Sequence, residues 1–148
     1  MPLRYEHAEP VDATPAAAFA LIDDLPRTNE WLPPCVSLTN VTGPPNKPGD
    51  KLHYVFKQGG KQQEMEGEIV ERVENEKLVS RYDDKAFTVV VDLRVTADGA
   101  QAVTHHAIEI TPKSLMGKLF SPLIKLGLKK QTTDAATNLK RILEAGSA

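Results

Sequence analysis

The sequence predicts an α+β fold in which one long C-terminal helix covers a seven-stranded antiparallel sheet. The first observation is the placement of proline: the 148-residue chain has 11 prolines, but none lies between Asp50 and Thr111. Proline is excluded from central strands, so a sheet is expected in this stretch. The second observation is a helical spacing of apolar residues within 122–144. A helix and a sheet that each have one apolar face bury those faces against each other.

The chain before the proline-free stretch predicts two strands and two short helical segments. Thr14 is followed by Pro15, a capping residue before proline at the first helical position. The second helical segment is expected to end at Pro33-Pro34. The expected elements are a strand, a helix, a helical turn and a strand, over residues 5–11, 16–24, 25–32 and 36–41.

Five further strands are expected in the proline-free stretch, as an antiparallel meander. Turn-forming residues recur there at the spacing of β-hairpins. The turn signals are Gly59-Gly60, Asn75-Glu76, Asp83-Asp84 and Asp98-Gly99. They separate the runs 51–57, 63–73, 77–82, 86–96 and 101–111.

Alternation along these runs distinguishes an inner from an outer face of the sheet. One alternate set in 86–96 is wholly apolar, which is typical of a strand with one buried face. The predicted inner face holds Leu52, Tyr54, Phe56, Met65, Gly67, Ile69, Phe87, Val89, Val91, Leu93, Val95, Ala102, Thr104, His106, Ile108 and Ile110. Glu64, Glu66 and Glu68 share the opposite face and form a solvated acidic stripe.

The C-terminal segment predicts a helix from Pro122 to Glu144, about 34 Å long at about 1.5 Å per residue. Ser121-Pro122 repeats the cap-plus-proline signal, and Gly127 interrupts the first half of the segment. The apolar face has 4-3-4-4-3 spacing and consists of Ile124, Leu128, Gln131, Ala135, Leu139 and Ile142. Laying this face across the inner face of the sheet completes the predicted fold.

The composition of the chain argues against several classes of function. Aromatic residues make up 5% of the chain and the net charge is −2, so a nucleic-acid-binding surface is not expected. Cys35 is the only cysteine, which excludes an intramolecular disulfide and a cysteine-based zinc site. The polar start lacks an apolar signal core, and no run approaches the about 20 apolar residues of a spanning helix. A cytoplasmic protein is expected, and its oligomeric state is left open.

Several short motifs follow one another along nearly the whole chain. They are VDATP at 11–15 leading to Phe19, WLP at 31–33, PGDKL at 48–52, GEIV at 67–70, MGKL at 116–119 and LKRILE at 139–144. In this order the motifs resemble the START-like helix-grip superfamily, also called SRPBCC, and are most similar to its bacterial polyketide cyclase/dehydrase-type members. The resemblance implies a single domain over 1–148, with a curved sheet wrapped around the long helix. It also implies a large cavity for a small hydrophobic molecule of the lipid, polyketide or aromatic type.

The residues expected to contact that ligand come from the inner face of the sheet, from the first short helices and from the long helix. They are Trp31, Tyr54, Phe56, Met65, Ile69, Tyr82, Phe87, Val89, Val91, Thr104, His106, Ile108, Phe120, Ile124, Leu128, Gln131 and Ala135. Small side chains on the helix, Thr132, Ala135 and Ala136, predict unfilled volume beneath it. A gap in a core is destabilising unless it is used. The alternative is a solid core that the aromatic side chains of the strands fill.

His106 is the best candidate for a catalytic residue. On the inner face it could act as a general base or as a hydrogen-bond donor to a ligand carbonyl, and the alternative is a core histidine with satisfied hydrogen bonds. His105 points to the opposite face, so the pair is not a metal motif. No metal site and no cofactor are predicted. Cys35 has no evident base nearby and is given no nucleophilic role.

Three functions stay open from the sequence. The first is a protein that binds a hydrophobic molecule, and the second is a cyclase-, dehydratase- or hydrolase-type enzyme acting on such a molecule in the same cavity. The third uses a basic, leucine-rich helix surface over 119–126, with Leu119, Leu123 and Leu126, to dock on a partner or an anionic membrane. These leucines could instead gate the mouth of the pocket.

Overall fold

The computed structural model describes residues 3–58, 60–85, 87–113 and 121–146, and the side chains of all of these except 58, 121–126 and 146. The elements follow the predicted order. They are β1 (Leu3–Val11), α1 (Pro15–Asp23), the 3₁₀ helix η1 (Leu25–Glu30), β2 (Cys35–Asn40), β3 (Lys51–Gln58), β4 (Lys61–Val73), β5 (Lys77–Asp83), β6 (Phe87–Asp98), β7 (Gln101–Pro112) and α3 (Ser121–Gly146).

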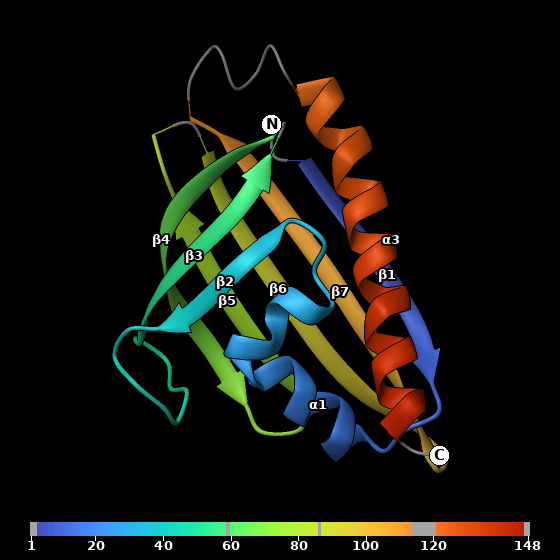
Figure 1. Cartoon of the computed structure of the whole chain (residues 1–148). Coiled ribbons are helices and arrows are strands. Elements are labelled where there is room, and N and C mark those ends of the chain that lie inside the picture. The colour runs from blue at the N-terminus through green and yellow to red at the C-terminus, as the bar shows by residue number, and fades with distance from the viewer. Residues whose placement is uncertain (1–2, 59, 86, 114–120, 147–148) are drawn as a thin grey trace.

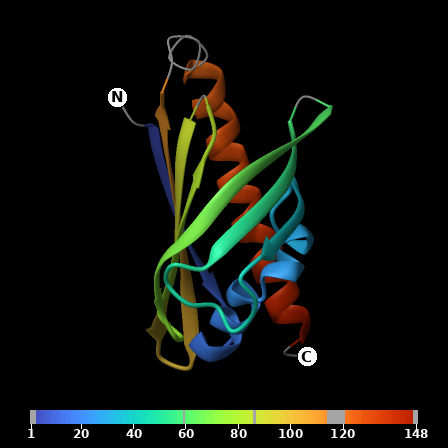
Figure 2. The same ribbon diagram turned by 90° about the vertical axis from the view of Figure 1, so that its left-hand side faces the viewer.

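The seven strands form one antiparallel sheet in the order β1-β7-β6-β5-β4-β3-β2. The sheet bends strongly, so β2 and β3 lie in front of β6 and β7, and α3 runs along β1 and β7 on the inner side of the bend (Figures 1 and 2). The predicted helix-grip fold is thereby confirmed, including the two short helical segments between the first two strands.

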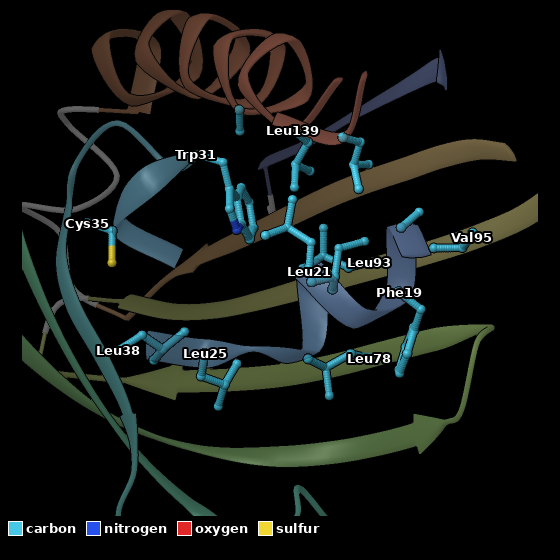
Figure 3. Packing of buried hydrophobic residues seen from close by; sticks show 14 of the residues in the cluster. Phe19, Leu21, Leu25, Trp31, Cys35, Leu38, Leu78, Leu93, Val95 and Leu139 are labelled. Carbon is cyan, nitrogen blue, oxygen red and sulfur yellow. The ribbon is translucent and has the colours of Figure 1, made fainter. Parts of the chain in front are cut away.

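The first helix begins where the cap signal predicts. Thr14 Oγ1 accepts a hydrogen bond from the backbone N–H of Ala17 at 3.1 Å, and Pro15 occupies the first turn. The buried face of α1 packs at one end of the sheet, where Phe19 and Leu21 join Leu93 and Val95 in the core (Figure 3). This end of the molecule is therefore closed by tightly packed apolar side chains.

Two irregularities that the alternation pattern did not predict help to bend the sheet. The pairing register shifts between Cys35 and Ser37 in β2, and between Ile69 and Glu71 in β4. A bulge of this kind bends its strand and increases the local twist. Gly67 has a related role, because a Cβ atom there would collide with the ring of Tyr82 on the neighbouring strand.

The long helix is continuous through Gly127, and one face of its middle part is buried. Thr132, Ala135 and Leu139 are each 0% exposed. The Thr132 hydroxyl donates to the carbonyl of Leu128 at 2.8 Å, so it brings no unpaired polar atom into the core. The small residues Thr132, Ala135 and Ala136 are therefore closely packed in the core, and the prediction that they leave a gap beneath the helix is corrected.

Candidate ligand-binding site

A cavity of about 740 Å³ lies between the inner face of the sheet, η1 and the first part of α3. Its floor consists of buried apolar side chains, including Ile22, Leu25 and Leu93. Some of the lining residues are exposed to solvent: Lys57 and Gln63 of the β3–β4 hairpin and Gly127 of α3. The cavity therefore opens between this hairpin and the beginning of the long helix.

Most of the residues predicted to contact a ligand lie together on the cavity wall. Those that line it are Trp31, Tyr54, Phe56, Met65, Ile69, Tyr82, Phe87, Val89, Val91, His106, Ile108, Leu128 and Gln131. Their contact with a ligand stays a prediction, but the structure gathers them around one space.

Four of the predicted residues are not among those lining residues. Thr104 is 2% exposed, and its hydroxyl donates to the carbonyl of Glu9 at 3.3 Å, so it lies between β7 and β1. Ala135 packs in the core beneath α3, farther along the helix than the residues that reach the cavity. Phe120 lies outside the described residues, and Ile124 belongs to the part of α3 whose side chains are not described.

The wall also includes residues that the sequence analysis did not assign to the site. They are Ile22, Leu25, Thr28, Leu32, Pro34, Leu38, Leu52, Lys57, Gln63, Leu78, Ser80, Asp84, Leu93, Ile110 and Gly127. Several of them lie two positions from a predicted residue and therefore on the same face of the strand. Ser80 is related to Tyr82 in this way, and Ile110 to Ile108. That signal was present in the sequence, whereas the contribution of α1 and η1 depends on how these segments fold back over the sheet.

An aromatic cluster forms one side of the cavity. Tyr54 stacks on Phe56 with a centroid distance of 5.0 Å, and its ring centroid lies 5.5 Å from that of Tyr82. Burial raises the pKa of Tyr82 to about 12 and also raises the pKa of Tyr54. Both phenols are therefore neutral at physiological pH and can donate hydrogen bonds.

His106 is buried on the opposite side of the cavity, at 3% exposure. Its ring meets the indole of Trp31 edge-on, with centroids 6.2 Å apart and an interplanar angle of 77°. Burial, and to a smaller extent the charge of His7 on the neighbouring strand, lower the pKa of His106 to about 4. The imidazole is therefore neutral at physiological pH.

Two other groups that could carry chemistry, a carboxylate and a thiol, have structural explanations. Asp84 lines the cavity near its mouth, and its Oδ1 atom accepts a hydrogen bond from the backbone N–H of Phe87 at 2.7 Å. Cys35 is buried, and burial raises the pKa of its thiol to about 12, so no thiolate forms at physiological pH. Within the described residues, no three His, Cys, Asp or Glu side chains cluster to hold a metal ion.

No helix in the described part of the chain has the length and apolar character needed to cross a membrane. The surface predicted for docking over 119–126 is not among the described side chains.

The curved sheet, the long helix and the cavity between them define a START-like helix-grip protein. Residues 2–144 match the family described as "Polyketide cyclase / dehydrase and lipid transport". The chain belongs to this family, and the resemblance drawn from its sequence motifs is confirmed. No curated protein sequence matches the chain.

Solved structures share the fold at low sequence identity. A START superfamily protein from Mycobacterium smegmatis is 13% identical with a TM-score of 0.80, over 97% of this chain and 98% of that chain. A protein from Thermus thermophilus is 16% identical with a TM-score of 0.79, over 100% of both chains. The ZhuI aromatase/cyclase from a Streptomyces species is 8% identical with a TM-score of 0.75, over 99% of this chain and 98% of that chain.

Proposed function

We propose that this protein binds a small hydrophobic molecule, of the lipid, polyketide or aromatic type, in the cavity between the sheet and α3. The observation that carries the proposal is the cavity itself. Its volume of about 740 Å³ falls within the range of about 300–1,000 Å³ that is common for ligand pockets. Protein interiors are otherwise close-packed, so an open space of this size with a mainly apolar wall supports a binding role.

The family and the structural relatives support the same class of ligand. The family description includes lipid transport, and one structural relative is described as an aromatase/cyclase. At sequence identities of 8% to 16%, these structures share the fold of this chain, but they do not identify its ligand.

The chemistry of the wall favours binding over catalysis. A cyclase, dehydratase or hydrolase needs convergent groups whose acidities match the reaction. His106, with its pKa lowered to about 4, is a weak base, and burial raises the pKa of Tyr82 to about 12, so that phenol is a weak acid. Docking on a membrane or partner through residues 119–126 remains a separate prediction.

Native mass spectrometry of freshly purified protein, followed by solvent extraction, tests the proposal. We expect a co-purifying hydrophobic molecule. Adding that molecule back to emptied protein at about 100 times its dissociation constant should stabilise the fold by about 2.7 kcal/mol. If the protein is empty and no member of a lipophile panel raises the melting temperature, the binding proposal fails.

A further inference from the structure

Gly67, in the interior of β4, is a glycine that the backbone conformation does not require. Four other described glycines have a positive φ, whereas Gly67 does not. A glycine within a strand weakens it, because it has no side chain to pack, and it often marks the close approach of another group. The space above its Cα atom is therefore the reason for a glycine at this position.

The ring of Tyr82 occupies that space. Gly67 pairs directly with Tyr82 of β5. A Cβ atom at Gly67 would lie 2.8 Å from Tyr82 Cε1 and 2.7 Å from the carbonyl oxygen of Arg81. Real Cβ atoms essentially never approach another heavy atom within 3.0 Å. Any side chain at position 67 must therefore displace the Tyr82 ring or the neighbouring strand.

Tyr82 is also part of the cavity wall, whereas Gly67 is not among the described lining residues. On the side away from β4, Tyr82 pairs with Val89 of β6, which also lines the cavity. The centroid of the Tyr54 ring lies 5.5 Å from that of Tyr82. A Tyr82 ring that is pushed off Gly67 has to move away from β4, over Val89 and into the cavity.

We propose that Gly67 sets the width of the cavity, because it lets the Tyr82 ring lie close against β4 and leaves the ligand space free. Gly67 is thus a positioning residue that acts through Tyr82 and determines how bulky a ligand the cavity accepts. This inference rests on the proposed binding function and concerns the size of the ligand.

Crystal structures of the wild type and of Gly67→Ala test the position of the ring without any ligand. We expect the Tyr82 ring to lie farther from β4 in Gly67→Ala and the cavity to be smaller. If the ring keeps its place over β4 and β5 shifts instead, the inference is refuted, whether or not the cavity binds a ligand.

A slim and a bulky probe test the consequence for binding. 1-Decanol and 1-adamantanemethanol are primary alcohols of similar carbon number, one a flexible chain and the other a rigid cage. Their dissociation constants are measured by calorimetry for the wild type, Gly67→Ala, Tyr82→Leu and the double variant. We expect Gly67→Ala to lower the cage-to-chain affinity ratio at least about 5-fold. A merely destabilised fold would weaken both probes alike and leave the ratio unchanged.

The double variant shows whether Gly67 acts through Tyr82. In the Tyr82→Leu background, Gly67→Ala should change the ratio by less than about 2-fold, because no ring remains to be displaced. An equal fall of the ratio with and without the ring would refute the route through Tyr82. Glu66→Ala is the matched control, since it changes the adjacent residue on the outer face, where Glu66 is hydrogen-bonded to His53. It should keep the wild-type ratio.

The remaining outcomes separate this inference from the proposed function. If Gly67→Ala does not fold, the double variant should fold, and a double variant that also fails would show that the strand backbone beside Arg81 requires the glycine and the ring does not. If both probes bind and Gly67→Ala leaves their ratio unchanged, the inference is refuted while binding in the cavity stands. If only other members of a lipophile panel bind, the ratio is measured on the slimmest and the bulkiest of them. If nothing binds, the proposed function falls and this inference falls with it.

Discussion

His106, a buried residue of the cavity wall, makes the stability of the fold depend on pH. In the folded protein, burial and then the charge of His7 lower the pKa of His106 from 6.5 to about 4. Between these values the unfolded chain binds a proton at this residue and the folded protein does not. Protonation therefore favours the unfolded chain as the pH falls.

We expect the stability that depends on His106 to be complete above pH 6.5 and to be lost as the pH falls toward 4. The loss should reach at most about 3 kcal/mol. The measurement is urea unfolding at a series of pH values, comparing the wild type with His106→Phe, which keeps an aromatic ring beside Trp31 and cannot titrate. The variant should have a flatter profile in this range.

His105→Asn is the matched control, because it removes the neighbouring histidine from the outer face, where it is hydrogen-bonded to Thr96. This variant should keep the steep loss of the wild type. Equal slopes for the wild type and His106→Phe would show that His106 is not held neutral in the folded protein.

The sequence could place His106 on the inner face but could not show its environment. Alternation along residues 101–111 determines the face on which each side chain lies. The low pKa depends on burial and on the charge of His7, and the edge-on ring contact depends on Trp31. Both residues come from distant parts of the chain. Thr104 illustrates the same limit: its inward orientation was predicted, but its hydrogen bond to β1 keeps it out of the cavity wall.

At the scale of elements, one ion pair connects α1 to the sheet. Arg72 of β4 donates two hydrogen bonds to the Asp23 carboxylate, at 3.0 and 2.8 Å, and its guanidinium lies 5.4 Å from the centroid of the Phe19 ring. Asn46 also donates to Asp23. Burial raises the pKa of Asp23, but the hydrogen bonds from Arg72 and Asn46 outweigh it, and the pKa lies below 3.8.

Arg72→Met should reduce the free energy of unfolding by about 2 kcal/mol at pH 7, because it leaves a partly buried carboxylate without its cationic partner. Methionine keeps an apolar stem beside Phe19. The difference from the wild type should shrink as the pH falls below the ordinary Asp pKa of 3.8, since a protonated Asp23 no longer needs the cation. Urea unfolding at pH 7 and pH 3 measures both effects.

Arg81→Met provides the comparison, because Arg81 pairs with Glu68 and Asp83 while its side chain is 45% exposed. An exposed pair contributes less than about 1 kcal/mol. Equal losses in the two arginine variants would show that the Asp23 pair does not brace α1.

The order of the elements could be predicted well because each has a local signal. Thr14-Pro15 marks the start of α1, and the proline-free stretch contains all five strands of the meander. The bulges in β2 and β4 have no comparable signal, because a register shift depends on the partner strand. The sequence therefore predicts the sheet but not how strongly it bends.

At the scale of the whole molecule, one end is solid and the other is hollow. Phe19, Leu21 and Val95 belong to the packed core at the α1 end, whereas the cavity lies toward the first part of α3. The small side chains around Ala135 predict open volume beneath them, but the structure places the cavity nearer Leu128 and Gln131. Side-chain sizes on one helix could not locate the cavity, because the bend of the sheet and the position of η1 determine it.

A cavity kept for a ligand lowers the stability of the empty protein, since its lining loses packing contacts. Val91 lies on the cavity wall and pairs with Ile108 on the inner face of the sheet. Val91→Phe should fill part of the space and raise the free energy of unfolding of the ligand-free protein by up to about 2 kcal/mol. The same change should weaken binding of the extracted lipophile at least about 10-fold, an affinity loss of about 1.4 kcal/mol.

Val90→Phe is the matched control, because the same substitution one residue earlier points to the outer face, where Val90 pairs with Arg81 and Glu109. It should change stability by less than about 0.5 kcal/mol and leave binding unchanged. Thermal melting with and without ligand measures both quantities in one experiment. If Val91→Phe instead destabilises the protein and Val90→Phe does not, the wall around Val91 is already packed and the space cannot hold a ligand as proposed. A more stable Val91→Phe protein that no longer binds would show that the fold gives up packing energy at this position to keep room for its ligand.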